Sequence, residues 1–441
     1  MAGGTWISQN KVRPGAYINF VSVIPPAMPV GDRGIGTMAL PLNWGAQGEL
    51  IDIYSTDLTD GSSLAKVGLT AFDEDAKLLN LMLSNCYLAR IYRLDSGGVK
   101  ASATDDDLTI TAKYSGTFGN NITVQIAEAN GAFDVTTWVN GASVHTQTVA
   151  AADELTANDF VSFDGIGALS ENAGIKLTGG SNGTAALGTA YPAYLGLAAK
   201  SRWQVMALTQ GNAQYAAQFA AFAKEMRNTE GKYVQVVVAN HAAADHIGVI
   251  NSDCGAVVDG VTVSAEEATA WVAGITGGAS VVQSNVGRVF PGASRILNER
   301  TNAEIIDALK RGMFILATNQ RGQIIAEDDI NSLNNFTAEL TKDFRLNQIV
   351  RVLDEIGTSV VDAWEQSFKG KVQNNADGRM LYKGVIITYL TELQRLGAID
   401  NFDYATDVNV SPGTEKDAVV ANLAVQPVAA MSKLYMTVFV S

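Results

Sequence analysis

Two stretches of the sequence, WQVMAL at residues 203–208 and YVQVVVA at residues 233–239, decide the fold class. Both are short, continuous apolar runs, which is the pattern of strands buried on both faces of a sheet. Four apolar side chains between them recur at helical spacing and form one face: Tyr215, Phe219, Phe222 and Met226. A buried strand, an amphipathic helix and a second buried strand predict a parallel sheet covered by helices, the α/β class.

The alternation of helix and strand continues downstream. Residues 265–273 (AEEATAWVA) are predicted to be a helix, with Ser264 as N-cap and Glu267 completing a capping box. Thr301 or Asn302 caps a further helix, which leads to the strand MFILA at residues 313–317. We therefore assign residues 185–330 to an α/β domain.

Residues 99–182 are rich in alternating strand patterns and are predicted to be an inserted β-sandwich or barrel. The pairs Asn130-Gly131 and Asn140-Gly141 flank one of these strands and are the residues that two-residue hairpin turns require. Between Lys100 and Ala190 there are ten acidic and three basic residues, a net charge of −7, half of the −14 of the whole chain. This concentration of charge predicts a solvent-exposed insertion.

The remaining segments complete the predicted organisation. Residues 1–22 contain a short strand pattern set off by prolines and are expected to form an extended arm. Residues 23–98 mix strand and helix patterns and are expected to form a small α+β domain. Residues 331–441 begin with helices and end in strands, which predicts an α+β domain at the C-terminal end.

The last strand pattern is the clearest in the chain. At period two, Leu434, Met436, Val438 and Val440 lie on one face. The opposite face holds the intervening residues Lys433, Tyr435, Thr437 and Phe439. One interpretation is a last strand paired within its own domain. The other is a strand that pairs with a second copy, since an apolar edge strand is a template for strand addition.

Composition excludes several classes of protein. The 441 residues are 47% hydrophobic and 17% charged, which predicts a globular chain of several domains. A net charge of −14 argues against binding nucleic acid through phosphates. The two cysteines, Cys86 and Cys254, indicate a reducing compartment, and no signal or membrane-spanning pattern occurs. We expect a soluble protein made in the cytoplasm, with no membrane partner.

No catalytic constellation is recognisable. The chain has three histidines, of which His241 and His246 are five apart, a spacing that does not put both on one helix face. No G-x-S-x-G elbow occurs, and the glycine-rich stretches lack the Lys-Ser/Thr of a phosphate loop. The acidic triplet at residues 105–107 is interpreted as a solvated loop. No cofactor, metal or catalytic residue is therefore predicted.

Four stretches together resemble the tail sheath proteins of contractile phages and related particles such as R-type bacteriocins. VRPGAYI at residues 12–18 resembles the opening strand of that family, and GTFGNNITV at residues 116–124 resembles its G-T-W-G-N motif. LTGGSNG at residues 177–183 resembles the L-x-G-G-x-D-G junction, and VQPVAAMSKLY at residues 425–435 resembles the closing P-V-D-x-M-E-K-I-Y strand. All four occur in the order of the family and span the chain.

The chain departs from these motifs at single positions: Phe118 stands for the usual Trp, Asn182 for Asp, Ala429 for Asp and Ser432 for Glu. The resemblance implies a subtilisin-like α/β domain without an active site, an inserted β domain and extended terminal arms. It also implies a structural protein of the virion tail, assembled in the host cytoplasm as stacked hexameric rings around a tube, with baseplate and tail terminator proteins as further partners. Contraction of such a sheath drives the tube through a bacterial envelope.

The resemblance assigns two sets of residues. The arm strands that would join neighbouring subunits contain Val12, Pro14, Gly15, Tyr17, Ile18, Phe20, Leu434, Tyr435, Met436, Val438, Phe439 and Val440. Cations that could face an acidic tube are Lys342, Arg345, Arg351, Lys369 and Lys371.

The sequence leaves two alternatives open. One is an α/β hydrolase-like enzyme with an appended β domain, which would need His241 or His246 in a triad. The other is a tube or other structural virion protein, which the length and the α/β pattern disfavour.

Overall fold

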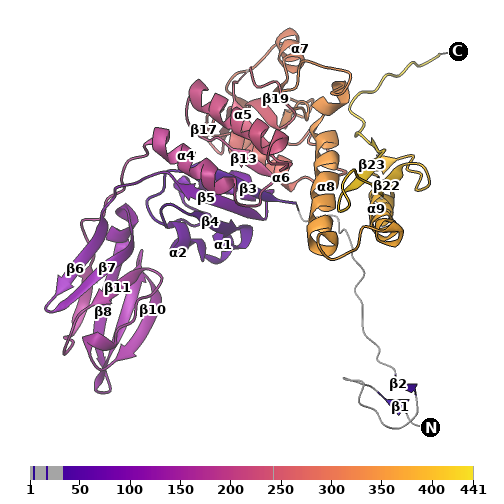
Figure 1. Cartoon of the computed structure of the whole chain (residues 1–441). Coiled ribbons are helices and arrows are strands. Elements are labelled where there is room, and N and C mark those ends of the chain that lie inside the picture. The colour runs from indigo at the N-terminus through magenta and orange to yellow at the C-terminus, as the bar shows by residue number, and fades with distance from the viewer. Residues whose placement is uncertain (1–2, 5–15, 18–32, 242, 441) are drawn as a thin grey trace. The chain divides into compact units, whose positions relative to one another are not determined.

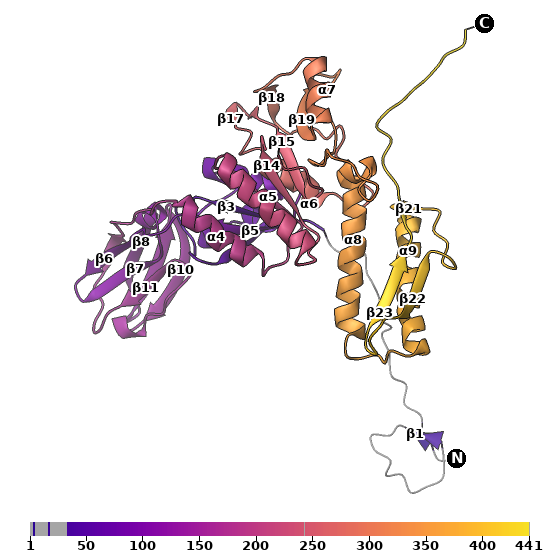
Figure 2. The same cartoon turned by 45° about the horizontal axis from the view of Figure 1, so that its top comes forward.

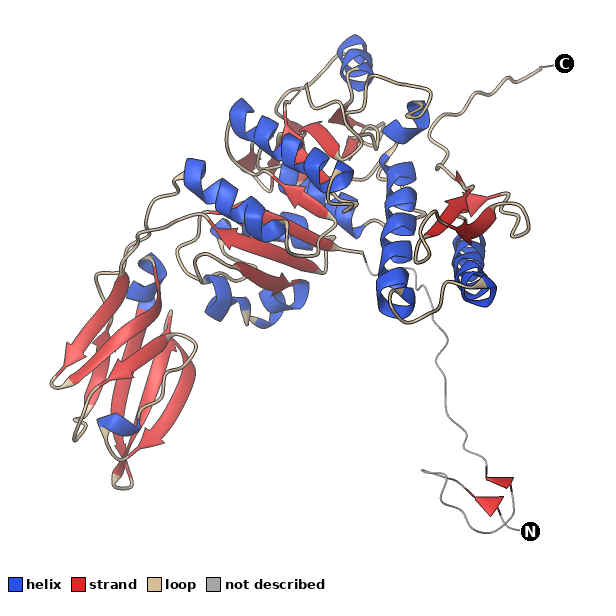
Figure 3. Cartoon of the chain, in the orientation of Figure 1, coloured by secondary structure: helices blue, strands red, loops and turns tan. Residues whose placement is uncertain are grey.

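A computed structural model describes residues 3–4, 16–17, 33–241 and 243–440 (Figures 1 and 3). The chain divides into a large unit, Gly31–Thr358 with Pro427–Ser441, and a small unit, Ser359–Gln426 with Met1–Val30.

An eight-stranded sheet forms the centre of the large unit, in the order β20-β19-β15-β14-β13-β3-β5-β4. The strands are β3 (Ile35–Leu40), β4 (Leu50–Tyr54), β5 (Leu88–Arg93), β13 (Val205–Ala207), β14 (Gln235–Ala239), β15 (Val249–Asp253), β19 (Met313–Thr318) and β20 (Ile324–Ala326). The strands from β19 to β5 run parallel, and β20 and β4 lie antiparallel at the two edges. The predicted α/β class and its strands β13, β14 and β19 are confirmed.

Helices cover both faces of this sheet. The helices of the large unit are α1 (Ser55–Asp60), α2 (Ser63–Val67), α3 (Lys77–Leu83), α4 (Leu187–Ala198), α5 (Ala213–Asn228), α6 (Thr269–Gly278) and α7 (Asn302–Lys310). On β14, Val236 and Val238 pack in the core with α4 and α5, whereas Val237 packs in the core with α3 and α6. This alternation explains why the strand is apolar at four successive positions, from Val236 to Ala239. A small antiparallel sheet adds β16 (Ala256–Val258), β17 (Val261–Val263) and β18 (Ala293–Ile296).

The predicted start of α7 is confirmed, and that of α6 is displaced. Thr301 caps α7, because its hydroxyl accepts from the Glu304 N–H while the Glu304 carboxylate accepts from the Thr301 N–H. Ser264 and Glu267 form the same pair of hydrogen bonds, but the residues that follow make turns and α6 begins only at Thr269. The capping pair therefore closes a turn before the helix.

The prediction of a separate small domain at residues 23–98 is wrong for the described part of that segment. Its strands β3, β4 and β5 belong to the central sheet, where β3 lies between β13 and β5. All six residues of β3 are buried, and a strand buried in this way needs a neighbour on each edge. The partner β13 is far away in sequence, so local patterns did not reveal the pairing.

The predicted inserted β domain is a sandwich (Figure 3). One sheet has the order β10-β9-β8-β12 and the other β11-β7-β6. The strands are β6 (Lys100–Asp105), β7 (Leu108–Ser115), β8 (Ile122–Ala129), β9 (Ala132–Val139), β10 (Ala142–Val149), β11 (Val161–Asp164) and β12 (Asn172–Lys176). Asn130 and Asn140 take positive φ angles of 53° and 50°, each followed by a glycine with positive φ, so both predicted hairpin turns form.

The small unit consists of helices and a hairpin. Its elements are α9 (Ala376–Leu396), β21 (Ile399–Asp400), β22 (Val408–Pro412) and β23 (Val419–Leu423), with β24 (Gln426–Pro427) at its boundary. α9 packs beside β22 (Figures 1 and 2). Near the N-terminal end, β1 (Gly3–Gly4) pairs in parallel with β2 (Ala16–Tyr17).

The division between the units falls inside α8 (Asn347–Ala363), between Thr358 and Ser359. The predicted C-terminal domain, residues 331–441, therefore spans both units, since residues 331–358 and 427–441 belong to the large unit. Buried polar contacts of α8 with that unit explain the difference, for Arg227 pairs with Asp354 at 2.6 Å. Among the described residues, no helix has the length and apolarity needed to cross a bilayer.

Candidate functional site

The C-terminal segment, residues 431–440, is the most unusual surface of the described chain. It forms neither helix nor strand and runs as an extended trace to the end marked C (Figure 1). Its large apolar side chains are exposed, from 69% at Val438 to 102% at Met431, with Tyr435 at 90%. The interpretation of a last strand paired within its own domain is therefore wrong for the single chain. We call residues 431–440 the C-terminal arm.

The segment just before the C-terminal arm is held in place. The Ala430 N–H donates to Oε1 of Gln348, 2.9 Å away, and the Gln348 amide also donates to the Val282 carbonyl oxygen at 3.1 Å. Burial raises the pKa of the Asp328 carboxyl, and the nearby Lys433 cation partly opposes that shift. Anchoring thus ends close to residue 430, and the apolar part of the arm begins directly after it.

An unpaired sheet edge lies in the small unit. β22 and β23 form a two-stranded antiparallel sheet, and no described strand lies on its outer edges. Val420 on β23 is 44% exposed. Open edges of this kind offer unpaired N–H and C=O groups to an added strand.

The predicted N-terminal arm lies mostly outside the described residues. Val12, Pro14, Gly15, Ile18 and Phe20 are in that part of the chain, and only Tyr17 is described, as a residue of β2. The arm residues at this end stay a prediction.

The predicted tube-facing cations fall into two groups. Arg345 and Arg351 are buried, with 8% and 1% exposure, which corrects their assignment to an accessible surface. Arg345 donates to the Leu309 carbonyl oxygen, and Arg351 is paired with Asp329. The other three, Lys342, Lys369 and Lys371, are exposed, so their predicted role stays open.

Two of the sequence motifs, residues 116–124 and 177–183, meet where the β-sandwich joins the rest of the large unit. Asn120 Nδ2 donates to the Gly180 carbonyl oxygen at 2.9 Å, and its Oδ1 accepts from the Gly180 N–H at 2.8 Å. Asn182 Oδ1 accepts from the Thr117 N–H at 2.8 Å. An aspartate in place of Asn182 could accept the same bond, so this departure from the motif keeps the contact.

Gly116 fits this junction for steric reasons. Its φ is +136°, and a Cβ there would lie 1.9 Å from the Asn43 carbonyl oxygen, which also accepts from the Phe118 N–H at 3.3 Å. The backbone of the motif therefore lies directly against the loop that contains Asn43.

Trp44 and Arg93 complete the junction, and sequence patterns had not singled them out. Trp44 is fully buried in the sandwich core, with its ring 5.0 Å from Phe118 and 5.2 Å from Tyr114. Arg93 Nη1 donates to the carbonyl oxygens of Gly45 and Ser115 at 2.9 and 2.8 Å. Burial lowers the pKa of the Arg93 guanidinium, while Asp95 opposes that shift. A lone tryptophan in an Asn-Trp-Gly loop was the only available signal.

His246 does not form a nucleophilic site with Ser332, which contacts it only through the backbone. The Ser332 hydroxyl contacts the backbone of His246, accepting from its N–H and donating to its C=O, both at 3.1 Å. The imidazole Nδ1 of His246 instead accepts from the Gly248 N–H at 3.0 Å. Burial lowers the pKa of His246 to about 4. In this arrangement the His246 imidazole does not activate Ser332, as a hydrolase would require.

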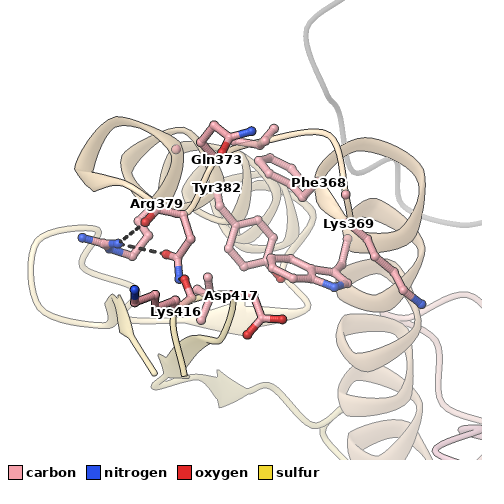
Figure 4. A pocket seen from close by; sticks show the side chains of 13 residues that line it. Phe368, Lys369, Gln373, Arg379, Tyr382, Lys416 and Asp417 are labelled. Carbon is pink, nitrogen blue, oxygen red and sulfur yellow. Dashed lines mark hydrogen bonds between the residues drawn. The ribbon is translucent and has the colours of Figure 1, made fainter. Parts of the chain in front are cut away.

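The small unit contains a pocket of about 430 Å³ (Figure 4). An aromatic cluster of Trp364, Phe368 and Tyr382 lines it, with ring centroids 4.8 to 6.3 Å apart. Trp364–Phe368 is a π-helical turn, a feature that often marks functional sites. Lys369, Arg379, Lys416 and Asp417 also line the pocket, which we call the aromatic pocket.

Comparison with known families defines the class of the protein. Residues 96–182 match the phage tail sheath protein beta-sandwich domain, residues 173–332 its central domain and residues 339–441 the phage tail sheath C-terminal domain. The chain therefore belongs to the phage tail sheath protein family, as the sequence motifs predicted.

Individual relatives agree with this assignment. The phage-like element PBSX protein XkdK of Bacillus subtilis is 36% identical over the full length of both chains. The sheath tail protein of Desulfitobacterium hafniense has a TM-score of 0.81 at 40% identity, covering 96% of this chain and 99% of its own. That of Listeria innocua has a TM-score of 0.83 at 31% identity, covering 92% and 94%. The helical sheath of the anti-feeding prophage in its contracted state shares the fold, with a TM-score of 0.56 at 12% identity over 97% of this chain and 99% of its own.

Proposed function

We propose that the chain is the structural subunit of a contractile sheath. Copies assemble as stacked hexameric rings around a tail tube, and contraction drives the tube through a bacterial envelope. The partners are further copies of the chain, the tube protein, and the baseplate and tail terminator proteins at the two ends. The subunit is made in the host cytoplasm, becomes part of the virion tail and has no enzymatic activity.

The exposed C-terminal arm is the observation that carries this proposal. Fixing the backbone costs roughly 1–2 kcal/mol per residue, whereas each ladder hydrogen bond returns only about 0.5–1.5 kcal/mol net. The balance requires apolar burial, which contributes about 1.5–3 kcal/mol for each large side chain. The four apolar side chains on one face of the arm can supply this burial only against another surface, because in the single chain they are exposed. These are Leu434, Met436, Val438 and Val440.

The unpaired β22–β23 sheet of a neighbouring copy is the proposed receptor of the C-terminal arm. Addition of an extended segment to such an edge satisfies both sets of backbone groups. We propose the same mode for the N-terminal arm, so that each subunit joins its neighbours through two strands. Linking strands of this kind can hold the lattice together while subunits rotate during contraction.

The proposal includes a subtilisin-like ancestry for the α/β domain without the catalytic residues. The support is the parallel order of the central sheet and the engagement of Ser332 and the His246 imidazole with the backbone. A hydrolase is disfavoured by the same contacts. Hydrolysis of ester or peptide substrates that disappears on substitution of His241 or His246 would restore that alternative.

Negative-stain electron microscopy of the concentrated full-length protein tests the proposal. Stacked rings or tubes of constant diameter are expected. A protein that stays strictly monomeric at high concentration, by sedimentation as well as by microscopy, would contradict it.

A further inference from the structure

A fully exposed phenylalanine projects from the large unit at the turn before α3. Phe72 is 96% exposed, although a phenyl ring is among the side chains most favoured in cores. Asp73, Glu74 and Asp75 follow it directly and are exposed as well. The segment thus presents an apolar knob beside three carboxylates, and we call residues 72–75 the acidic knob.

The turn that holds the acidic knob is well supported. Asp73 Oδ2 accepts from the N–H and the hydroxyl of Thr70, at 2.6 and 2.7 Å. The Ala71 carbonyl oxygen accepts from the side chain of Asn80 on α3 at 2.9 Å. Because these bonds fix the backbone on both sides of Phe72, little backbone freedom is lost when the ring docks on a partner.

The aromatic pocket of the small unit has the complementary character. One wall of the pocket is aromatic and consists of Trp364, Phe368 and Tyr382. Its charged lining residues are three cations, Lys369, Arg379 and Lys416, and one carboxylate, Asp417. Arg379 Nη1 is oriented by the Asn374 side chain at 2.9 Å and by its carbonyl oxygen at 3.2 Å (Figure 4). A net positive aromatic pocket is unusual in a chain with a net charge of −14.

We infer that the acidic knob of one copy docks in the aromatic pocket of a second copy, with Phe72 against the aromatic wall and the carboxylates beside the cations. Ring packing of this kind adds attraction beyond buried area, and complementary charge sets the orientation of the two copies. The contact is separate from strand addition by the arms. It rests on the proposed self-assembly, because the knob and the pocket belong to different copies.

Other occupants fit the pocket less well. The aromatic face of the C-terminal arm, with Tyr435 and Phe439, also carries Lys433, which the pocket cations would repel. Ile166 on the sandwich is 76% exposed, but it is aliphatic and has only Asp164 close by in sequence. Tyr404 is less exposed than Phe72, at 67%, and both carboxylates beside it, Asp403 and Asp407, bond their own loop, whereas the acidic knob has Glu74 and Asp75 besides the bonded Asp73. Among the residues that the structure describes, Phe72 best combines a fully exposed ring with adjacent exposed carboxylates.

Disulfide trapping between two full-length variants tests this inference. A tagged Phe72→Cys variant is mixed with a Gln373→Cys variant, since Gln373 lines the pocket without contributing a charge. The matched control replaces Phe72→Cys by Ile166→Cys. The natural cysteines do not compete, because Cys86 and Cys254 are buried and burial raises the pKa of Cys86 to about 12.

The expected result is a mixed dimer of the Phe72→Cys and Gln373→Cys variants in assembled tubes, about tenfold more abundant than with the Ile166→Cys control. Reversing the knob charges (Glu74→Lys with Asp75→Lys) or the pocket charges (Lys369→Glu with Lys416→Glu) should lower the yield about tenfold, and combining both reversals should restore it.

Each contrary result has a distinct meaning. Tubes that form while the Phe72→Cys pair cross-links no better than the control overturn the inference and leave the proposed function standing. A wild-type protein that forms no tubes overturns both. Efficient cross-linking within single dilute chains that carry both cysteines overturns docking between copies. A higher yield of Gln373→Cys with a Tyr435→Cys variant of the C-terminal arm than with Phe72→Cys overturns it as well.

Discussion

Arg351 Nη2 lies 3.4 Å from Oδ2 of Asp329, and the two side chains are 0% and 2% exposed. The Asp329 carboxylate also accepts from the Asn347 side chain and from the Asn285 N–H, both at 3.0 Å. The pair therefore fixes the first turns of α8 in the large unit. This anchoring makes the start of α8 a rigid part of that unit, close to the Gln348 contact that holds the segment before the C-terminal arm.

Replacing Asp329→Asn should destabilise the large unit strongly. The change leaves the buried Arg351 cation without its counter-charge, which typically costs about 3–5 kcal/mol. Urea unfolding monitored by circular dichroism measures the loss. The control is Glu365→Gln, whose exposed partner Lys369 lies 3.7 Å away, and it should change stability by about 0.5 kcal/mol or less. Equal effects of the two substitutions would refute the structural role of the buried pair.

Reversal of the three exposed lysines tests their predicted position at the tube. Lys342→Glu, Lys369→Glu and Lys371→Glu together should weaken sedimentation of the sheath protein with its tube about tenfold or more at low salt, because charge complementarity would become repulsion. Lys369 also lines the aromatic pocket, so the double variant Lys342→Glu with Lys371→Glu should already show most of this loss if the lysines face the tube. The difference should shrink as salt screens it. Lys310→Glu, on the exposed end of α7, is the control. If the triple variant binds the tube as the control does, these lysines do not face it.

Gly116→Ala should loosen the attachment of the β-sandwich. A Cβ at this position would overlap the Asn43 carbonyl oxygen at 1.9 Å, so the loop and the motif must move apart. We expect a loss of several kcal/mol, on the order of the larger core defects. Gly131→Ala also has a positive φ but meets no neighbouring atom, and should cost only about 1–2 kcal/mol. Differential scanning calorimetry distinguishes them, and similar losses would contradict this view of the junction.

Stability should fall between pH 6.5 and pH 4 partly because of His246. Burial, followed by the charges of Arg227 and Lys224, lowers the pKa of this imidazole from 6.5 to about 4. The unfolded chain therefore takes up a proton near pH 6.5 that the folded chain takes up only near pH 4, so the free energy of unfolding decreases on acidification. After solvent screening, the loss should be about 1–2 kcal/mol.

The variant His246→Asn isolates this contribution, because asparagine can accept the Gly248 N–H without titrating. The difference between wild type and variant in urea-unfolding free energy should depend on pH in this window and be constant above pH 7.5. Parallel pH profiles of the two proteins would show that His246 does not contribute.

Local patterns predicted the elements whose own residues indicate their burial or their backbone conformation. β14 is apolar at successive positions because both its faces are covered, and Asn130-Gly131 forms a hairpin because these residues tolerate positive φ. The motif residues Gly116 and Asn120 were found by resemblance, and the structure supplies their physical reason in the contacts with Asn43 and Gly180.

The predictions that failed concern contacts between residues that are far apart in sequence. The place of β3 in the central sheet was not predicted, because its neighbour β13 begins at Val205, far along the chain. Arg351 looked like a surface cation because no local pattern reveals its partner Asp329, 22 residues away. Phe72 and Trp44 were missed because a single aromatic residue in a loop does not indicate whether it is exposed or buried.

Removal of Met431–Ser441 tests the central claim, that the exposed C-terminal arm links one copy to the next. The truncation leaves Ala430 and its bond to Gln348 intact, so the circular dichroism spectrum and the melting temperature should match those of the full-length protein. A full-length Thr437→Ser variant, altered only on the face of the arm opposite Leu434 and Val438, serves as the assembly-competent control.

Electron microscopy of the truncated and full-length proteins at equal concentration is the decisive measurement. Tubes or stacked rings are expected for the full-length protein and for Thr437→Ser, and only dispersed, folded subunits for the truncated chain. Tubes formed by the truncated chain, or its global unfolding, would contradict the assignment of the arm as the link between subunits.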